Sequence, residues 1–340
     1  ISISSQTVIS HPRDFGAVET MKAMISDLKP GNRVASYFSV KFKKAPREYK
    51  YGWMFEIRAA DASGEMTAKY WGPPSQAEVQ KAFDSFSSCD VVKVTGEARE
   101  FGQGVEIGIN PKNGDILARL PEGEYDLRDL VGRSPVDKEV MAAELAVIVA
   151  SVKDKHLVLV LDRFFGTEGI LDAFSAAPAS MQMHSNYAGG LLEHSIKVAR
   201  ICDAMAGQYP AVDRDLLVAG ALLHDVGKVR EMETGTSIEI SDEGMFRGHV
   251  VIGDEMVNEA MARIPDFPAA LRLKLSHMML SHHGKKEWGS PKEPQTAEAL
   301  LLHFGDMADS QVFQYLRARA EAKTDDDWTW DRRLGHIYLK

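Results

Sequence analysis

The spacing of apolar residues changes once along this chain, and the change limits the protein to a β-rich N-terminal part and a helical C-terminal part. Apolar and polar residues alternate over residues 34–42 and 53–59, as in strands that are buried on one face. From residue 137 onward, apolar residues recur at helical spacing. A length of 340 residues also favours two domains.

The N-terminal part has the element order of a small barrel. Strand patterns occur at residues 34–42, 53–59, 65–71, 91–97 and 105–109, and a helix is expected over 77–86 after Ser75. The polar residues 43–50 are interpreted as the first hairpin loop. Three strands, a helix and two strands is the order of an OB-fold, whose second and third strands commonly bind oligonucleotides. The sequence therefore predicts a multi-domain chain, an all-β OB-fold barrel followed by an all-α domain.

Positive charge and aromatic rings are concentrated in this barrel. The whole chain carries a net charge of −9, which argues against a protein that coats nucleic acid through bulk charge. Residues 29–58, however, hold eight basic and two acidic side chains. Cations for phosphates and rings for bases suit a single strand, although the rings could instead fill the barrel and the cations form a solvated hairpin. The predicted contacts here are Lys41, Lys43, Lys44, Arg47, Tyr51 and Trp53.

A segment rich in Gly, Pro and charged residues separates the two parts. It covers residues 111–135 and predicts a linker. We expect an N-terminal extension over 1–26, the OB domain over 27–112, the linker over 113–136 and the helical domain over 137–340. Helices are predicted over 137–152, 155–165, 190–209, 213–223, 249–263, 269–281 and 296–322, with a small hairpin over 236–246.

The pair His224-Asp225 lies at the end of an apolar helix. Two adjacent side chains of this kind are costly to bury unless a partner, such as a divalent cation, binds both. Gly227 follows and is expected to end the helix in a left-handed cap. Further candidate ligands lie in separate helical segments: His194, His249, His282, His283 and Asp306.

The arrangement H...HD...D resembles the signature of the HD phosphohydrolase superfamily, a helical metal-dependent fold. The resemblance implies that His194, His224, Asp225 and Asp306 hold a first metal ion. It also implies that His249 and His282 hold a second one. Imidazole and carboxylate ligands suit Mn²⁺ best, with Fe²⁺, Co²⁺ or Zn²⁺ as alternatives to the oxygen-preferring Mg²⁺.

The order of domains and three longer motifs narrow the resemblance. An OB-type domain before YAGGLLEHS, LLHDVGKVRE and SHHGKKEWGSPKEP is similar to the YhaM-type 3′→5′ exoribonucleases. This implies hydrolysis of single-stranded RNA, or DNA, to nucleoside 5′-monophosphates. Two ions about 3.5 to 4 Å apart, bridged by Asp225 and a water, would activate that water for the displacement.

Several neighbouring side chains have expected supporting roles. Asp225, Lys228 and His283 are the predicted catalytic residues, with Lys228 neutralising a phosphate oxygen and His283 assisting the leaving group. Lys285 and Lys286 are predicted to bind substrate. Asp309 is expected behind the ligands, Glu193 at the surface, and His184 stays unassigned. The remaining helical-domain histidines are expected in the core: His156, His277, His303 and His336.

The chain has features of a cytoplasmic protein. Cys89 and Cys202 form no disulfide framework, and no signal peptide or transmembrane helix is expected. The predicted partner is a single-stranded nucleic acid rather than a membrane, while protein partners and a homo-oligomer stay open. Two alternatives remain: a phosphohydrolase or phosphodiesterase of small or cyclic nucleotides, and a noncatalytic nucleic-acid-binding adaptor.

Overall fold

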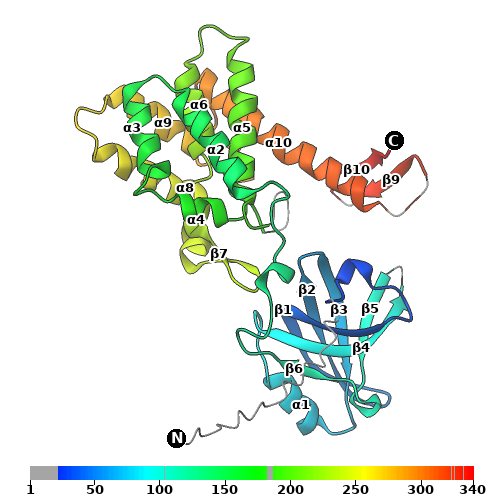
Figure 1. Cartoon of the computed structure of the whole chain (residues 1–340). Coiled ribbons are helices and arrows are strands. Elements are labelled where there is room, and N and C mark those ends of the chain that lie inside the picture. Colours follow the sequence, from blue (N-terminus) through cyan, green and yellow to red (C-terminus); the bar gives the residue numbers. More distant parts are fainter. Residues whose placement is uncertain (1–21, 103, 182–186, 323, 325, 332) are drawn as a thin grey trace, which may run out of the picture.

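The protein consists of a β-rich domain and a helical domain joined by a linker (Figure 1). The computed structural model describes residues 22–102, 104–181, 187–322, 324, 326–331 and 333–340. The C-terminal half of the last helix, with the hairpin that follows it, extends away from the helical bundle (Figure 1). In these described residues no helix is long and apolar enough to cross a membrane.

The β-rich domain is a closed barrel with OB-fold topology. The strand order is β1-β2-β3-β5-β4, and β4 also pairs with β1, which closes the ring. The β3–β5 pairing is parallel, and the other pairings around the ring are antiparallel. The strands are β1 (Arg33–Tyr49), β2 (Gly52–Asp61), β3 (Gly64–Trp71), β4 (Val91–Phe101) and β5 (Gly104–Ile109). This order confirms the predicted fold class of the N-terminal part.

The first strand is longer than the sequence pattern suggested. Residues 43–49 belong to β1, so their interpretation as a loop is wrong. The strand is irregular between Val40 and Phe42 and between Lys44 and Arg47, and these irregularities let one strand pair with both β2 and β4. A strand that bends in this way loses the clean alternation of apolar residues on which the prediction depended.

Apolar side chains fill the inside of the barrel, and one helix covers part of it. Phe38, Val40 and Phe55 are buried with Val79 of α1 (Gln76–Asp84). Ser75 accepts a hydrogen bond from the Glu78 backbone N–H, as expected for a helix cap. Within the predicted linker, β6 (Leu117–Arg119) adds to the sheet beside β4.

The helical domain follows the predicted order closely. Acidic or hydroxyl side chains cap the starts of five helices, namely Asp137, Asp154, Asp213, Ser241 and Thr296. The helices are α2 (Lys138–Ala150), α3 (Lys155–Phe165), α4 (Leu171–Ala176), α5 (Gly190–Ala206), α6 (Arg214–Leu223), α7 (Lys228–Glu231), α8 (Asp242–Ala262), α9 (Ala269–Ser281) and α10 (Ala297–Glu321).

Two regions of this domain differ from the prediction. The hairpin begins and ends earlier than the predicted 236–246. It consists of β7 (Met232–Thr234) and β8 (Ile238–Ile240), and α8 already begins at Asp242. A kink at Gly248, with φ of 68°, separates the first part of α8 from the predicted segment after it. The short α4 and the terminal strands β9 (Trp328–Asp331) and β10 (Gly335–Tyr338) were not predicted.

Each domain has its own apolar core, and a small polar contact joins them. One core lies within the barrel and the other among the helices of the bundle. Between the domains, the Cys89 Sγ donates a hydrogen bond to Glu239 Oε1 at 2.7 Å. The Thr236 hydroxyl donates to the Cys89 carbonyl at 2.5 Å. The β7–β8 hairpin therefore holds the helical domain against the loop before β4.

Candidate metal centre

The sharp turn after α6 places His224 and Asp225 at the centre of the bundle. Gly227 has φ of −61° and ψ of −20°, so the predicted left-handed cap is wrong. The chain instead continues through a right-handed turn into α7. A Cβ on Gly227 would lie 2.1 Å from the His249 carbonyl oxygen. Glycine is therefore required here because the backbone of α8 approaches it closely.

Imidazole and carboxylate side chains from separate helices form two groups around this turn. In each group, the three candidate ligand atoms lie within 4.8 Å of one another. In the first group, His194 Nε2 lies 3.3 Å from both His224 Nε2 and Asp306 Oδ1. In the second group, the Nε2 atoms of His249 and His283 are 3.2 Å apart. The first group is His194, His224 and Asp306, and the second is His249, His282 and His283.

The two carboxylate oxygens of Asp225 face different groups. Oδ2 lies 3.4 Å from His224 Nε2 and 3.6 Å from His194 Nε2. Oδ1 lies 3.4 Å from His249 Nε2 and 3.7 Å from His282 Nε2. One carboxylate thus lies between both groups, which is the arrangement of a bridging ligand.

Five imidazoles are held with the same ring nitrogen toward the site. Each Nδ1 faces an oxygen acceptor, at 2.7 to 3.0 Å. A neutral ring must donate from Nδ1 in this position, so its Nε2 lone pair is available to a metal. The acceptors of His194, His224, His249, His282 and His283 are, in that order, Asp309 Oδ2, Ala221 O, Glu231 Oε1, Met279 O and Trp288 O.

Two polar atoms at the centre fit a metal site particularly well. Among the described residues, Asp225 Oδ1 and His282 Nε2 are buried without any hydrogen-bond partner. A buried polar atom without a partner is costly unless a ligand satisfies it. Nitrogen and carboxylate donors in this number suit a first-row divalent ion. The residues present therefore fit divalent metal binding.

The pKa values in the site reflect burial and the neighbouring charges. Burial opposes ionisation of Asp225, but Lys228 and His224 outweigh it and hold its pKa well below the usual value. Burial also opposes protonation of His194, yet hydrogen bonds with Asp306 and Asp309 raise its pKa to about 9. Burial, followed by the charge of His283, lowers the pKa of His282 strongly. Carboxylates stay charged here while His282 stays neutral.

The structure assigns partners that the sequence reasoning missed. Glu231 accepts from both the backbone N–H and Nδ1 of His249, each at 2.9 Å. The only sequence feature that points to Glu231 is its place three residues after Lys228, one helical turn beyond the His224-Asp225 pair. Glu193, expected at the surface, is buried and accepts hydrogen bonds from Ser134, Tyr187 and Lys197. Its three donors and its position at the start of α5 explain why burial is tolerated.

The predicted catalytic residues Lys228 and His283 have different surroundings in the site. Lys228 lies beside Asp225, with Nζ 2.5 Å from Oδ2, so it neutralises this carboxylate in the structure. His283 lies with His249 and His282 among the candidate ligands rather than apart from them.

The other histidines divide between core and surface. His303 is buried, and its Nδ1 lies 2.9 Å from the His282 carbonyl oxygen. His156 and His277 are half-buried. His336 is exposed, so its expected place in the core is wrong; it lies on the terminal β10 strand, which the helical interpretation of this region did not anticipate. His184 lies outside the described residues.

The predicted nucleic-acid contacts do not form one continuous surface. The Lys43 ammonium donates to the carbonyls of Phe83 and Phe86, at the end of α1. Lys44 and Arg47 both pair with Glu56. Tyr51 is exposed, whereas Trp53 packs partly against the barrel core. Three others lie elsewhere: Lys41 toward the helical domain, and Lys285 and Lys286 exposed beyond α9.

Comparisons with known proteins agree with the division of the chain into a β-rich and a helical domain. Residues 191–309, about a third of the chain, match the model of the HD domain family. This match contains His194, His224, Asp225, His249, His282, His283 and Asp306. The chain therefore combines an OB-type barrel with a helical HD domain, and its clustered histidines and aspartates are of the kind that holds divalent metals.

Several solved structures are similar to this chain at low sequence identity, and three of them match about a third of it. The p204 HINb domain is 12% identical with a TM-score of 0.23, over 29% of this chain and 47% of that one. The second OB-fold domain of replication protein A from Methanococcus maripaludis is 18% identical with a TM-score of 0.25, over 31% and 100%. Schizosaccharomyces pombe Pot1pC bound to ssDNA is 8% identical with a TM-score of 0.22, over 31% and 89%. This chain thus spans about half the length of the first of them.

Proposed function

We propose that this protein is a metal-dependent 3′→5′ exonuclease that hydrolyses the phosphodiester bonds of single-stranded RNA or DNA to nucleoside 5′-monophosphates. The observation that carries the proposal is Asp225, whose two oxygens face two separate groups of candidate ligands. Such a centre suits phosphodiester hydrolysis, in which both the attacking and the leaving oxygen need stabilisation. The direction of cleavage comes from the resemblance to YhaM-type exoribonucleases.

Because Asp225 lies between the two groups of ligands, the groups would hold two separate ions that share this carboxylate. His194, His224, Asp225 and Asp306 hold the first ion, while Asp225, His249, His282 and His283 hold the second. Mn²⁺ is the proposed metal, since five imidazoles favour a first-row transition ion over Mg²⁺. Bound ions supply Lewis acidity and lower the pKa of a coordinated water.

The protein side chains have distinct roles around these ligands. Lys228 compensates the negative charge of Asp225 and keeps that buried carboxylate ionised. Asp309 and Glu231 orient the rings of His194 and His249. The OB-type barrel, with Lys44, Arg47 and Tyr51 exposed on it, binds the strand that enters the site.

A single experiment tests this function. A 5′-labelled 12-nucleotide RNA and the matching DNA are incubated with the protein in Mn²⁺, in Mg²⁺ and in chelator, and products are separated on a sequencing gel. Progressive shortening from the 3′ end in Mn²⁺, lost in His224→Ala and Asp225→Ala, is expected. An intact label in all conditions contradicts the proposal.

The same assay separates the alternatives. A small-nucleotide phosphodiesterase would leave the oligonucleotides intact and hydrolyse members of a panel of mononucleotides and cyclic dinucleotides. A noncatalytic adaptor would bind the oligonucleotide and hydrolyse neither substrate. Glu259→Gln, which alters an exposed acid on α8, is the control variant and should keep wild-type activity.

A further inference from the structure

We propose that the cleft between the two domains is the channel for the single strand, where Lys41 and Arg133 bind its phosphates before the strand reaches the metal centre. This inference rests on the proposed function and extends it to residues outside the metal site. The cleft has a volume of about 720 Å³. Its walls come from the β2–β3 turn, the linker, the β7–β8 hairpin, α10 and the β9–β10 hairpin.

The charges in the cleft favour an anion. Five cationic and three acidic residues line it. The acids already have partners: Asp61 accepts from the Ile25 and Ser63 backbone, Glu65 pairs with Arg58, and Asp331 accepts from the backbone of its own hairpin. The five cations are Lys41, Arg58, Arg133, Arg317 and Arg333.

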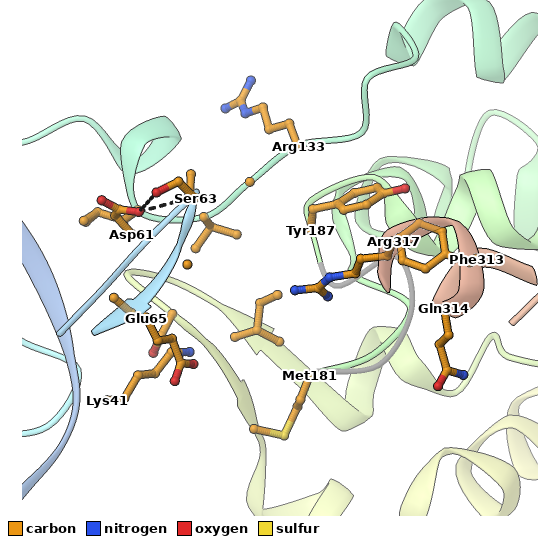
Figure 2. A pocket seen from close by; sticks show the side chains of 18 of the residues that line it. Lys41, Asp61, Ser63, Glu65, Arg133, Met181, Tyr187, Phe313, Gln314 and Arg317 are labelled. Atoms are coloured by element: carbon orange, nitrogen blue, oxygen red, sulfur yellow. Dashed lines mark hydrogen bonds between the residues drawn. The ribbon is translucent and has the colours of Figure 1, made fainter. Parts of the chain in front are cut away.

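Lys41 and Arg133 are the cations best placed to take a new partner. Across the described ranges of the chain, neither side chain makes an ion pair or hydrogen bond, whereas Arg58 is paired with Glu65. Figure 2 shows Lys41 on the barrel side of the cleft, Arg133 on the linker above it, and Arg317 reaching in from α10. Cationic residues from three parts of the fold therefore line the same cleft, which favours a polyanion.

Helix α10 connects this cleft to the metal centre. Asp306 and Asp309 face the His194 ring, and Phe313 and Arg317 follow Asp309 at intervals of four residues on the same helix face. With a rise of 1.5 Å per residue, Phe313 lies about 6 Å and Arg317 about 12 Å farther along the axis. The cleft thus begins about one helical turn beyond the residues that position the first group of ligands.

Aromatic side chains on the same wall supply a surface for a base. The Tyr187 and Phe313 rings have centroids 6.4 Å apart and are tilted by 49°. Both line the cleft beside Arg317 (Figure 2). The Tyr187 hydroxyl donates to Glu193 at 2.8 Å, and Glu193 precedes His194. A ring that contacts a base here is therefore fixed to the helix that carries a ligand, and stacking on it tolerates any base.

Equilibrium binding tests the channel without depending on catalysis. The full chain is titrated against a 5′-fluorescein 12-nucleotide RNA in chelator, and anisotropy is measured at several salt concentrations. Lys41→Gln/Arg133→Gln should weaken binding by about tenfold and flatten the log–log salt slope by about 1.4, or 0.7 per lost phosphate contact. The matched control Lys81→Gln/Lys155→Gln removes two exposed cations outside the cleft and should change neither quantity.

Activity measurements and a third variant distinguish the possible results. Phe313→Leu should weaken binding without changing the salt slope, because it removes a ring and no charge. In Mn²⁺, the double variant should lose kcat/KM on the 12-nucleotide RNA but keep it on the p-nitrophenyl ester of thymidine 5′-monophosphate, which is too short to reach the cleft. Wild-type affinity and slope in the double variant overturn the channel. Absence of hydrolysis by the wild type overturns the proposed function instead, and the binding result still stands.

Discussion

At the scale of single residues, Asp225 determines the character of the site. It is buried, it lies between two groups of imidazoles, and Lys228 balances its charge. The remaining ligands each belong to one group only. Removal of this carboxylate should therefore affect both groups at once, in contrast to removal of any histidine.

Asp225→Asn should abolish the stabilisation of the protein by Mn²⁺. At an ion concentration of 100 times Kd, binding stabilises a folded protein by about 2.7 kcal/mol, which corresponds to a rise of about 5 to 10 °C in the Tm of a domain of this size. Differential scanning fluorimetry with and without Mn²⁺ measures this rise in Tm. Glu259→Gln should retain the full shift, and a shift of equal size in Asp225→Asn would contradict the bridging role.

Gly227→Ala should destabilise the helical domain by about 3 kcal/mol or more, because the new methyl group collides with the backbone of α8. Urea unfolding followed by circular dichroism gives the change in free energy. Gly235→Ala is the matched control, since a Cβ there has no atom within 4 Å. Equal stability of the two variants would show that α8 moves away from the turn at little cost.

At the scale of elements, residue patterns predicted most helices well and predicted irregular elements poorly. The bounds 155–165 and 269–281 agree with α3 and α9, because Asp154 caps the start of the first helix and Pro268 precedes the second. The second half of β1, residues 43–49, was interpreted as a loop because the bends of this strand interrupt alternation. The four-residue α7 and the strands β7 and β8 are too short for any period to be visible.

The candidate ligands could be assigned from motif spacing, but their supporting contacts could not. Which carboxylate faces Nδ1 of a given ring depends on helix packing: His194 and Asp309 are 115 residues apart in sequence. The same limit applies to the nucleic-acid contacts. Lys43 and Lys41 are two residues apart, yet one binds carbonyls at the end of α1 and the other faces the cleft.

One contact between elements has a predictable pH dependence. Asp215 of α6 accepts hydrogen bonds from the backbone N–H groups of Lys153 and Asp154, before α3. Burial opposes its ionisation, but these bonds and Arg214 outweigh burial and lower its pKa. Its contribution to stability is therefore complete above the unfolded pKa of about 3.9 and is lost as the pH falls through the lower folded value.

Asp215→Asn should consequently lower the free energy of unfolding by about 1 to 3 kcal/mol at pH 7, and by less below pH 4. Thermal unfolding of the wild type and the variant at pH 7 and at pH 3 measures the change in the free energy of unfolding. Asp172→Asn alters a carboxylate that is fully exposed and should have little effect at either pH. An equal loss at pH 7 and at pH 3 would show that the charge of Asp215 is not what stabilises the contact.

At the scale of the whole molecule, the two cores are separate and the candidate ligands all lie in one of them. The barrel core includes Phe38 and Phe55, and the bundle core includes Leu191 and Leu222. The polar contact of Cys89 with Glu239 and Thr236 adds little apolar burial between them. Each domain should therefore unfold as its own cooperative unit.

Calorimetry should show two transitions, only one of which responds to metal. Addition of Mn²⁺ should raise the Tm of the helical domain and leave that of the barrel unchanged, and chelator should reverse the change. The far-UV circular dichroism signal of helices assigns the transitions, since the long helices α2, α5, α8 and α10 all belong to the helical domain. A single transition that moves as a whole would show instead that the domains unfold together.

The shared position of Asp225 also has a consequence for how such a sequence can change over generations. A chain that loses Asp225 loses the carboxylate that faces both ligand groups, so later loss of His194 or His282 costs no further activity. Effects of these substitutions are then strongly epistatic rather than additive. Relatives of this protein should therefore carry either the complete ligand set or a broadly eroded one, and rarely a set that lacks Asp225 alone.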